Sequence, residues 1–323
     1  MEKVLVTGVT GFIGSNLAKE LVGRGYKVYG FERFVTGRDH RVEEEFLKGV
    51  EILTCDIDDY HSVSGAMKKV DPDLVFHLAS LSPVRESFER PFPYIDTHVV
   101  GTANIAYSML ELPNSERRRL IYASTAEVYG FQEITPTKES AALNPSSPYA
   151  TVKAACDMYI RMMSRVYGLN AAVIRCTNSY GRKLDASFFI EYLVVTMLKG
   201  DRVYIGAPDS LRDYMYVTDH VNAYLKAMEG KKVSGEAFNA STGEMRSNKD
   251  TAYKIADMIG FGRKGITLGK YPSGYPSRPI ESDQTAISLD SSKIARVFGW
   301  KPTVSLDDGL KKTIKYWSER IKS

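Results

Sequence analysis

Tyr149 and Lys153 stand four residues apart in the stretch YATVK, in a segment that we expect to be helical. Residues at positions i and i+4 share one face of a helix, so the phenol and the ammonium can meet. A phenol ordinarily titrates near pH ~10, and a neighbouring ammonium favours the phenolate and lowers its pKa. The pair therefore predicts a general base, with a surface pair of no chemical role as the alternative when the spacing is taken by itself.

The stretch STAEVYG, residues 124–130, adds two hydroxyls and a carboxylate to this candidate chemistry. It follows the apolar run RRLIYA, which we interpret as a buried strand, so Ser124 and Thr125 stand at the strand's end. Glu127 comes two positions later, and a carboxylate there is unfavourable unless it is solvated, paired or used. Two interpretations of Glu127 stay open, a solvated turn residue and a group that acts on a substrate.

These side chains need a scaffold, and the first two-thirds of the chain alternates short β-branched runs with helical patterns. The runs are KVLVTG (3–8), KVYGFE (27–32), VEILTCD (50–56), DLVFHLA (73–79), RLIYAS (119–124) and AAVIRCT (171–177). Strands that are apolar throughout and separated by helices predict a parallel sheet covered on both faces. The fold class is therefore α/β, a Rossmann-type doubly wound sheet, and we expect a dinucleotide-binding domain over residues 1–177.

From about residue 178 the alternation of strand and helix patterns becomes less regular. Loops lengthen, and short strands such as DRVYI and EAFNAST alternate with helices such as VTDHVNAYLKAM. We expect residues 178–323 to form mainly a smaller C-terminal α/β lobe, with chain crossings back to the first domain. Such a lobe would cover the carboxyl ends of the strands, where doubly wound proteins bind their ligands.

The stretch GVTGFIG places Gly8, Gly11 and Gly14 directly after the first strand and at the start of a helix. Glycines there permit a tight turn and a close backbone approach to a pyrophosphate, which the helix N-terminus attracts. Glu32 ends the second strand, where a carboxylate accepts hydrogen bonds from the ribose 2′-hydroxyl and favours NAD. Arg33 follows at once, and because an arginine can hold a 2′-phosphate, NADP stays open as the alternative cofactor.

Five further stretches carry a resemblance that covers nearly the whole chain. They are NPSSPYATVKAACDMYI (144–160), RCTNSYG (175–181), LRDYMYVTDH (211–220), SRP (277–279) and FGWKPTVSLDDGLKKTIKYW (298–317). Together with the glycine spacing, they resemble the extended branch of the short-chain dehydrogenase/reductase superfamily, the NAD-dependent epimerase/dehydratase family that acts on nucleotide sugars. The sequence departs from that family's pattern at His98, where many relatives have Asn, and at Arg182, where Pro is usual.

The resemblance implies a role for individual residues of this sequence. In catalysis, Thr125 would contact the sugar O4, Glu127 would act at C5 and C6, Tyr149 would be the base of the hydride step, and Lys153 would modulate it. The implied cofactor contacts are Gly8, Thr10, Gly11, Phe12, Ile13, Gly14, Glu32, Arg33, Asp56, Ile57, Leu78, Ala79, Ser80, Ser124, Tyr149 and Lys153. The implied substrate contacts are Ser82, Thr125, Asn178, Arg212 and Arg278, with both arginines on the diphosphate.

The reaction depends on residues 125–127. Related nucleotide-sugar 4,6-dehydratases carry T-x-E there, and the Glu removes the C5 proton once C4 is a ketone, before water leaves from C6. Related 4-epimerases carry small or neutral residues and need no carboxylate. Thr125-Ala126-Glu127 therefore predicts a 4,6-dehydratase. The first alternative is a 4-epimerase, and the next is a nucleotide-sugar reductase or a UDP-glucuronate decarboxylase. Ala126 is a departure, because dTDP-glucose dehydratases carry Asp and GDP-mannose dehydratases Ser at this position.

The composition of the chain argues against several other classes of protein, namely nucleic-acid-binding, membrane, secreted and metal-binding proteins. The chain has 323 residues, 43% of them hydrophobic and 25% charged, with a net charge of +4 that is too small to predict nucleic-acid binding. Apolar runs stay below the roughly 18 residues that span a membrane, and MEKVLVTG lacks the features of a signal peptide. Three cysteines show no metal spacing, so we expect a cytoplasmic protein without a metal site. A non-catalytic dinucleotide sensor on this fold is the alternative class, against which the Tyr149 and Lys153 pair argues.

The helix expected from Tyr149 onward also predicts a partner. Its sequence AACDMYIRMMSRVYG carries apolar residues on more than one face. We expect one face to pack on the sheet and another on a second copy of the chain, giving a homodimer with a four-helix interface. Burial of all these residues within one chain is the alternative.

Overall fold

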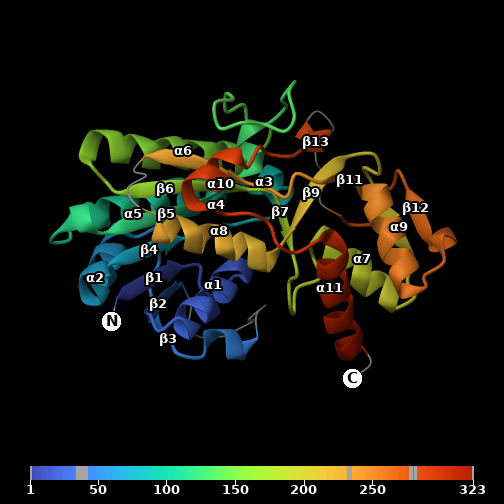
Figure 1. Ribbon diagram of the computed structural model, residues 1–323, viewed down its shortest axis with the longest axis horizontal. Coiled ribbons are helices and arrows are strands. Elements are labelled where there is room, and N and C mark those ends of the chain that lie inside the picture. Colours follow the sequence, from blue (N-terminus) through green and yellow to red (C-terminus); the bar gives the residue numbers. More distant parts are fainter. Residues whose placement is uncertain (1, 34–42, 231–234, 276–278, 280–281, 322–323) are drawn as a thin grey trace.

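The computed structural model describes residues 2–33, 43–230, 235–275, 279 and 282–321, and its larger lobe is built on a parallel sheet (Figure 1). The strands of this sheet are β1 (Lys3–Thr7), β2 (Lys27–Glu32), β3 (Val50–Thr54), β4 (Leu74–His77), β5 (Arg119–Thr125), β6 (Ala171–Cys176) and β10 (Glu236–Ala240). Within the described residues they form one seven-stranded sheet in the order β10-β6-β5-β4-β1-β2-β3. Neighbouring strands are parallel, as in the register that sets Leu5 beside both Tyr29 and Val75.

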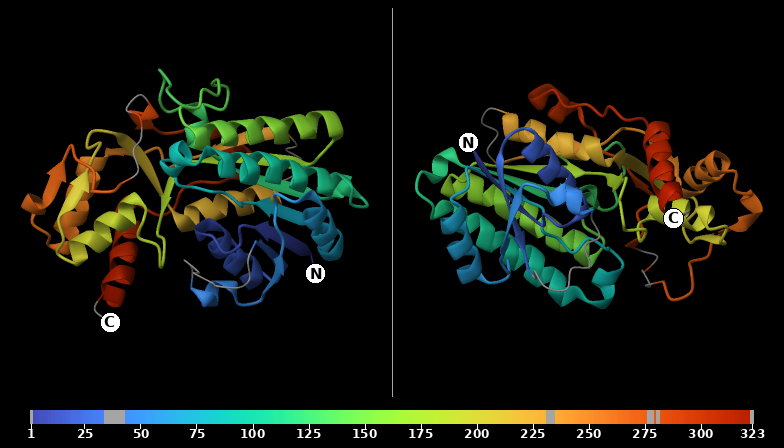
Figure 2. Two further views of the ribbon diagram at one scale, coloured as in Figure 1. Left: turned by 180° about the vertical axis from the view of Figure 1, so that it is seen from behind. Right: turned by 90° about the horizontal axis from the view of Figure 1, so that it is seen from below.

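Helices cover both faces of this sheet, as Figures 1 and 2 show. One face carries α1 (Phe12–Gly23), α8 (Val217–Glu229) and α10 (Ser292–Phe298), and the other carries α2 (Tyr60–Val70), α5 (Gly101–Leu110) and α6 (Pro148–Tyr167). Because apolar side chains meet the sheet from both sides, β6 is buried at every position. The predicted doubly wound α/β fold is confirmed, and the observed strand ends lie within two residues of the predicted ones.

A smaller lobe lies beyond the carboxyl ends of the main strands, at the right of Figure 1. It contains β7 (Asn178–Tyr180), α7 (Phe189–Leu198), β8 (Val203–Ile205), β9 (Leu211–Tyr216), β11 (Met245–Ser247), α9 (Asn248–Ile259), β12 (Ile266–Leu268), β13 (Ala286–Ile287) and α11 (Leu306–Ile321). Leu193, Ile255 and Leu310 share its core. The chain crosses back more than once after residue 177, because α8, β10 and α10 all pack with the first sheet.

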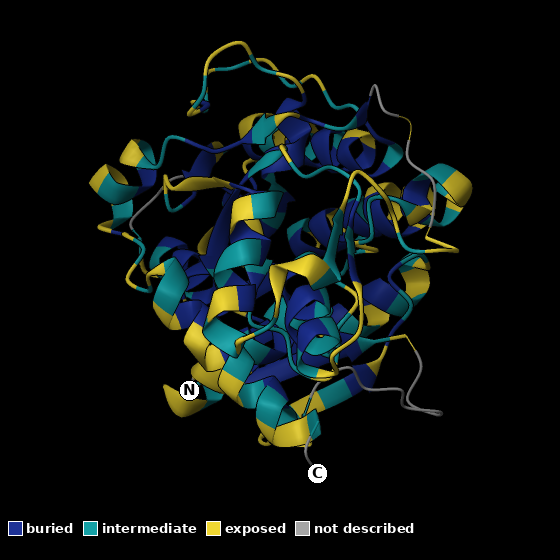
Figure 3. Ribbon diagram, turned by 90° about the vertical axis from the view of Figure 1, so that its right-hand side faces the viewer, coloured by how far each residue is buried: buried dark blue, intermediate teal, exposed yellow. Residues whose placement is uncertain are grey.

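Short elements connect these layers. They are η1 (Glu44–Leu47), α3 (Glu86–Glu89), α4 (Pro91–Tyr94), the π-helical turn η2 (Ile95–Val100), and the 3₁₀ turns η3 (Ser115–Arg117), η4 (Ala126–Tyr129) and η5 (Arg263–Gly265). Figure 3 shows burial concentrated in the strands and on the inward faces of the helices. In the part of the chain that the structure describes, no helix has both the length and the apolar character needed to cross a membrane.

Candidate active site

The glycine turn between β1 and α1 leaves no room for side chains. Gly8 adopts a positive φ of 69°, and a Cβ atom there would lie 2.8 Å from the backbone of Ala79. A Cβ atom on Gly14 would lie 2.1 Å from the carbonyl oxygen of Gly8. Gly11 caps α1 without a side-chain hydrogen bond, so the first N–H groups of the helix are left for an anion. Thr10, Phe12 and Ile13, all half-buried, complete this stretch, which fits the pyrophosphate of a dinucleotide.

The end of β2 and the loop after β3 form the expected adenosine side of the site. Half-buried Glu32 is the last residue of β2, and Arg33 follows it. The Arg33 Nε donates to Asp56 Oδ1 at 3.1 Å, and the same guanidinium pairs with Asp58. Ile57 between these acids is buried. Because Arg33 is engaged by two carboxylates, this end fits the ribose hydroxyls of NAD better than a 2′-phosphate.

The loop after β4 is fixed against the glycine turn by buried polar contacts. Thr7 Oγ1 lies 2.7 Å from Nδ1 of His77 and accepts from the backbone N–H groups of Leu78 and Ala79 at 3.2 and 3.1 Å. Burial, with a smaller contribution from the charge of Lys153, lowers the pKa of His77 to about 3. The predicted cofactor loop 78–80 is therefore held beside Gly8 by a neutral histidine and one hydroxyl.

Helix α6 presents Tyr149 and Lys153 to the end of β5. Ser147 caps the helix by accepting from the N–H of Ala150 at 3.1 Å, and Pro148 follows as its first residue, so Tyr149 lies in the first turn. The Lys153 ammonium donates to the carbonyl oxygen of Ala123 and lies 4.8 Å from the ring centroid of Tyr122. Burial lowers the pKa of Lys153 to about 8.

The pKa of Tyr149 differs from the sequence expectation. Burial, followed by the negative charge of Glu127, raises it above the ordinary value, whereas a hydrogen bond with Thr125 lowers it. The ammonium of Lys153 is turned to Ala123 and does not provide the expected large depression. In the protein alone, Tyr149 therefore keeps its proton at neutral pH. The same contacts place Thr125, Glu127 and Tyr149 in one cluster.

His98, on the π-helical turn, is packed beside Tyr149. The two rings are 5.8 Å apart and nearly perpendicular, and the ring of Tyr94 stacks on His98 from another side. The His98 Nε2 lies 3.2 Å from the backbone nitrogen and 3.1 Å from the carbonyl oxygen of Leu81. Burial, followed by the charge of Lys153, lowers the pKa of His98 to about 3. His98 is thus a neutral structural group that joins the cofactor loop to Tyr149.

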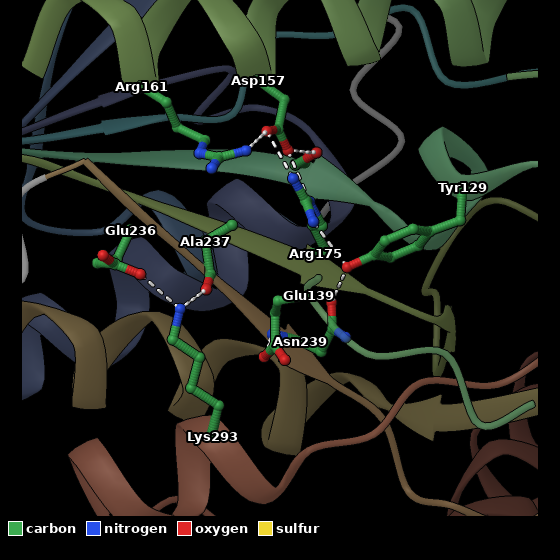
Figure 4. Close-up of polar contacts among 10 residues, drawn as sticks. Tyr129, Glu139, Asp157, Arg161, Arg175, Glu236, Ala237, Asn239 and Lys293 are labelled. Carbon is green, nitrogen blue, oxygen red and sulfur yellow. Dashed lines mark hydrogen bonds and ion pairs between the residues drawn. The ribbon is translucent and has the colours of Figure 1, made fainter. Parts of the chain in front are cut away.

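Ser124 and Thr125 point in different directions, as successive strand residues do. The Ser124 hydroxyl donates to Asp157 at 2.9 Å, within a fully buried network. Asp157 accepts two hydrogen bonds of 2.8 Å from Arg175, whose Nη1 donates to the Tyr129 hydroxyl at 2.7 Å (Figure 4). Only Thr125 of the pair therefore meets Tyr149, and the contact of Ser124 with the cofactor stays a prediction.

Glu127 is only 9% exposed, so the interpretation of this residue as a solvated turn carboxylate is wrong. Its backbone N–H donates to the Thr125 hydroxyl at 3.3 Å, which fixes the first turn after β5. Its Oε2 accepts from Nε2 of Gln284 at 3.0 Å. Ala126 beside it is packed in an apolar cluster with Ile287. Glu127 is therefore a buried, oriented carboxylate with no second acid at position 126.

The predicted substrate contacts lie on several segments. Arg212 of β9 is buried, and its Nη2 donates to Asp283 at 3.0 Å. Asn178 begins β7 and Ser82 follows β4, and both are exposed. Arg278 lies outside the residues that the structure describes. Sequence reasoning predicted Arg212 and Glu127 separately and did not find the segment around residues 283–285, which contacts both.

Two further residues of the site were missed by sequence reasoning. The Ser87 hydroxyl accepts from the backbone N–H of Tyr149 at 3.1 Å, and Gln284 contacts Glu127. Neither residue belongs to a sequence motif with a chemical role, so no local pattern in the sequence identifies them. Arg182, noted as a departure from the family pattern, is stacked between the rings of Phe12 and Phe188, with its guanidinium 4.4 and 3.4 Å from their centroids.

Fold and site together define a dinucleotide-dependent enzyme whose candidate active site contains a tyrosine and a buried carboxylate. The chain belongs to the GDP-mannose 4,6-dehydratase family, whose family model matches residues 5–313, and the predicted family is confirmed. It is 30% identical to dTDP-glucose 4,6-dehydratase 1 of Escherichia coli, over 99% of this chain and 96% of that protein. It is also 30% identical to the UDP-glucose 4-epimerase of Mycolicibacterium smegmatis, over 98% of this chain and 99% of that one.

Solved structures give the same two kinds of relative. The UDP-glucose 4-epimerase of Thermotoga maritima, solved with UDP-glucose, superposes with a TM-score of 0.87 at 28% identity, covering 99% of both chains. The dTDP-glucose 4,6-dehydratase of Streptomyces venezuelae, solved with NAD, superposes with a TM-score of 0.85 at 25% identity, covering 99% of this chain and 98% of that chain. The predicted class, an NAD-dependent dehydratase or epimerase of nucleotide sugars, agrees with these relatives.

Proposed function

We propose that this protein is an NAD-dependent nucleotide-sugar 4,6-dehydratase, which converts an NDP-hexose to the 4-keto-6-deoxy sugar. The observation that carries the proposal is the buried carboxylate of Glu127 beside Thr125 and Tyr149. A 4-epimerase moves no proton at a carbon atom next to the ketone and has no need of a base there. Among the described residues Gln284 donates to this carboxylate, and a buried, oriented carboxylate is the kind of group that elimination at C5 and C6 requires.

When bound along the glycine turn and Glu32, NAD supplies oxidation of the sugar at C4 before the elimination and reduction at C6 after it. The positive charge of the nicotinamide ring of bound NAD would favour the phenolate of Tyr149. Tyr149 then takes the proton from the O4 hydroxyl, which Thr125 orients. Glu127 then removes the proton from C5, whose acidity comes from the neighbouring ketone. The electrons of the C5–H bond form a C5–C6 double bond as the C6–O bond breaks, and the departing hydroxide needs a proton to leave as water.

Ala126 limits the source of that last proton. Its side chain has no acidic hydrogen and packs among apolar residues. Glu127, which has just taken the C5 proton, is therefore the group proposed to give it to the departing oxygen. In this scheme one carboxylate is first the base and then the acid of the elimination. C5 regains a proton from water when C6 is reduced, and Tyr149 releases the proton that it took from O4. The net change is the loss of one water.

The test is to incubate the protein and NAD with dTDP-glucose, GDP-mannose or UDP-glucose in turn and to measure the mass of the product by mass spectrometry. A dehydratase gives a product lighter by one water from at least one of them. The variant Glu127→Gln should lose about 10²-fold or more of this activity, the usual contribution of a general base. Glu133→Gln, at an exposed position in the following loop, is the matched control and should keep it.

A 4-epimerase is the second candidate function, and Ala126 is the observation that favours it. If the product keeps the mass of the substrate and has the opposite configuration at C4, the epimerase is correct. Glu127→Gln would then leave the rate nearly unchanged. A product lighter by carbon dioxide would point instead to a decarboxylase.

We also infer a homodimer formed through α5 and α6. The outward faces of these helices expose Tyr107 (51%), Met158 (55%) and Val166 (61%), and Met158 and Val166 are two turns apart on one face of α6. The double variant Met158→Lys, Val166→Lys should be a monomer in sedimentation experiments. The control is Val297→Lys, an exposed apolar position on α10 at the opposite face of the sheet, which should keep the oligomeric state.

A cytoplasmic location is part of the same proposal. Its support is chemical: Cys55, Cys156 and Cys176 are all free and buried. Proteins that fold in oxidising compartments more often carry disulfides. Fractionation of cells that express the full chain would test this.

A further inference from the structure

Gln284 is the side chain that fixes the carboxylate of Glu127. Its Nε2 donates to Oε2 of Glu127 at 3.0 Å, and the two residues are 2% and 9% exposed. They are 157 positions apart in the chain, and the contact joins the loop after β5 to the loop before β13. A buried hydrogen bond to a charged acceptor is among the stronger kinds, and it restricts the carboxylate to one orientation.

The position of Gln284 is set in turn by Arg212. The Arg212 Nη1 donates to the carbonyl oxygen of Gln284 at 2.9 Å, and Nη2 pairs with Asp283 at 3.0 Å. The backbone N–H of Leu211 donates to the carbonyl oxygen of Thr285 at 2.8 Å, which aligns the segment with β9. The arginine expected to bind the substrate diphosphate is therefore two hydrogen bonds away from the carboxylate expected to act on the sugar.

An amide is chemically suited to this place. Arg or Lys at position 284 would form an ion pair with Glu127 and weaken it as a base, and an acid would compete with it for a proton. A leucine of similar size would leave the buried carboxylate oxygen without its donor. Glutamine donates one hydrogen bond without adding charge, so it orients Glu127 and leaves the carboxylate basic.

We propose that Gln284 is a positioning residue for Glu127, and that Arg212 holds Gln284 in the orientation that aims the carboxylate at C5 of the sugar. This inference rests on the proposed function. It assigns to residues 283–285 the task of linking the binding of the substrate diphosphate to the alignment of the base. Gln284 acts on the reaction only through Glu127.

The experiment compares Gln284→Leu, Gln284→Asn and Glu127→Gln with the unaltered enzyme. Gln284→Leu should lower kcat about 10- to 100-fold, because misplacement of a reacting group has effects of this order. KM for the nucleotide sugar and the affinity for the nucleoside diphosphate should stay near their original values. Exchange of the C5 hydrogen with deuterated water should slow in parallel with kcat. Gln284→Asn, which keeps the donor on a shorter side chain, should recover part of the loss.

Ser288→Ala is the matched control, since it removes a buried hydroxyl of the same segment that contacts Asp213 rather than Glu127. It should reproduce any effect on thermal stability without the loss of kcat. In the double variant with Glu127→Gln, Gln284→Leu should add no further loss, because both changes act through one group. Additive losses, or a Gln284→Leu enzyme with unchanged kcat, overturn the role of Gln284 alone. An unaltered enzyme that epimerises without losing water overturns the proposed function, and this inference with it.

Discussion

The two halves of the candidate site, the proposed cofactor end and the proposed sugar end, are built differently. At the cofactor end the backbone itself forms the site, because Gly8 and Gly14 crowd each other within one strand-turn-helix unit, and Gly8 also packs against the backbone of Ala79 in the loop after β4. At the sugar end the side chains come from distant segments, as Glu127 and Gln284 show across 157 positions. The first kind of site follows from spacing along the chain. The second exists only after two lobes have come together.

The largest effect expected from this difference concerns Tyr149. Tyr149→Phe removes the phenolic hydroxyl at the sugar end and leaves the glycine turn intact. We expect kcat to fall by about 10²- to 10⁴-fold, the usual range for a general acid–base group. NAD affinity, measured by calorimetry, should fall far less than kcat, because the glycine turn that holds the pyrophosphate is unaltered. A variant that keeps its turnover would show that the base lies elsewhere, and a sensor protein would keep both its binding and its biological output.

The next effect concerns the buried network behind β5. Asp157 and Arg175 are both fully buried and joined by two hydrogen bonds of 2.8 Å. Asp157→Asn leaves the guanidinium without its charge partner, and we expect the free energy of unfolding to fall by about 3–5 kcal/mol in chemical denaturation. The double variant Asp157→Leu, Arg175→Met removes both charges and should recover most of that loss. If the single variant were as stable as the original protein, the pair would not be holding the end of β5.

These two cases show what the sequence could predict. Tyr149 was found because a helix brings i and i+4 together, a local rule that needs no knowledge of the fold. The doubly wound sheet was found because strands buried on both faces are apolar at every position. Asp157 lies four residues beyond Lys153, but its partner Arg175 is on a strand, and the sequence contains no rule that pairs a helix residue with a strand residue. Gln284 was missed for the same reason.

Predicting the electrostatics of the site was harder still. The spacing of Tyr149 and Lys153 suggested a phenol with a depressed pKa. The structure shows that burial and Glu127 raise it, because helix spacing says which residues can meet and not how deeply they are buried. Arg278 lies outside the described residues, so its expected contact with the substrate diphosphate stays a prediction.

A smaller effect is expected at the cofactor end. In Gly14→Ala the new Cβ atom would lie 2.1 Å from a backbone oxygen, so α1 has to shift. We expect a loss of about 1–3 kcal/mol in the free energy of unfolding, as for other overpacked sites, together with weaker NAD binding in calorimetry. Gly23→Ala, in the last turn of the same helix with no atom within 4 Å of its Cβ, should be neutral or stabilising. Equal effects of both changes would contradict a site shaped by close backbone approach.

The smallest effect lies where the two ends meet, at His98. The pKa of His98 is lowered to about 3, chiefly by burial, whereas an unfolded histidine titrates near ~6.5. As the pH falls from 6.5 toward 3, the unfolded chain takes up a proton here that the native protein does not, so stability falls. At pH 5 this amounts to roughly 2 kcal/mol, on a scale of about 1.4 kcal/mol for each pH unit.

His98→Asn introduces the residue that many relatives carry and removes this titration. The loss of unfolding free energy between pH 7 and pH 5 should therefore be smaller by roughly 2 kcal/mol than in the original protein, measured by denaturant unfolding. His77 and His220, whose pKa values are also lowered to about 3, remain in both proteins and cancel in the comparison. His61→Asn, at an exposed position on α2, is the control and should keep the original difference. An unchanged difference in His98→Asn would mean that His98 takes up its proton inside the folded protein, and that the junction between the cofactor loop and Tyr149 is open to water.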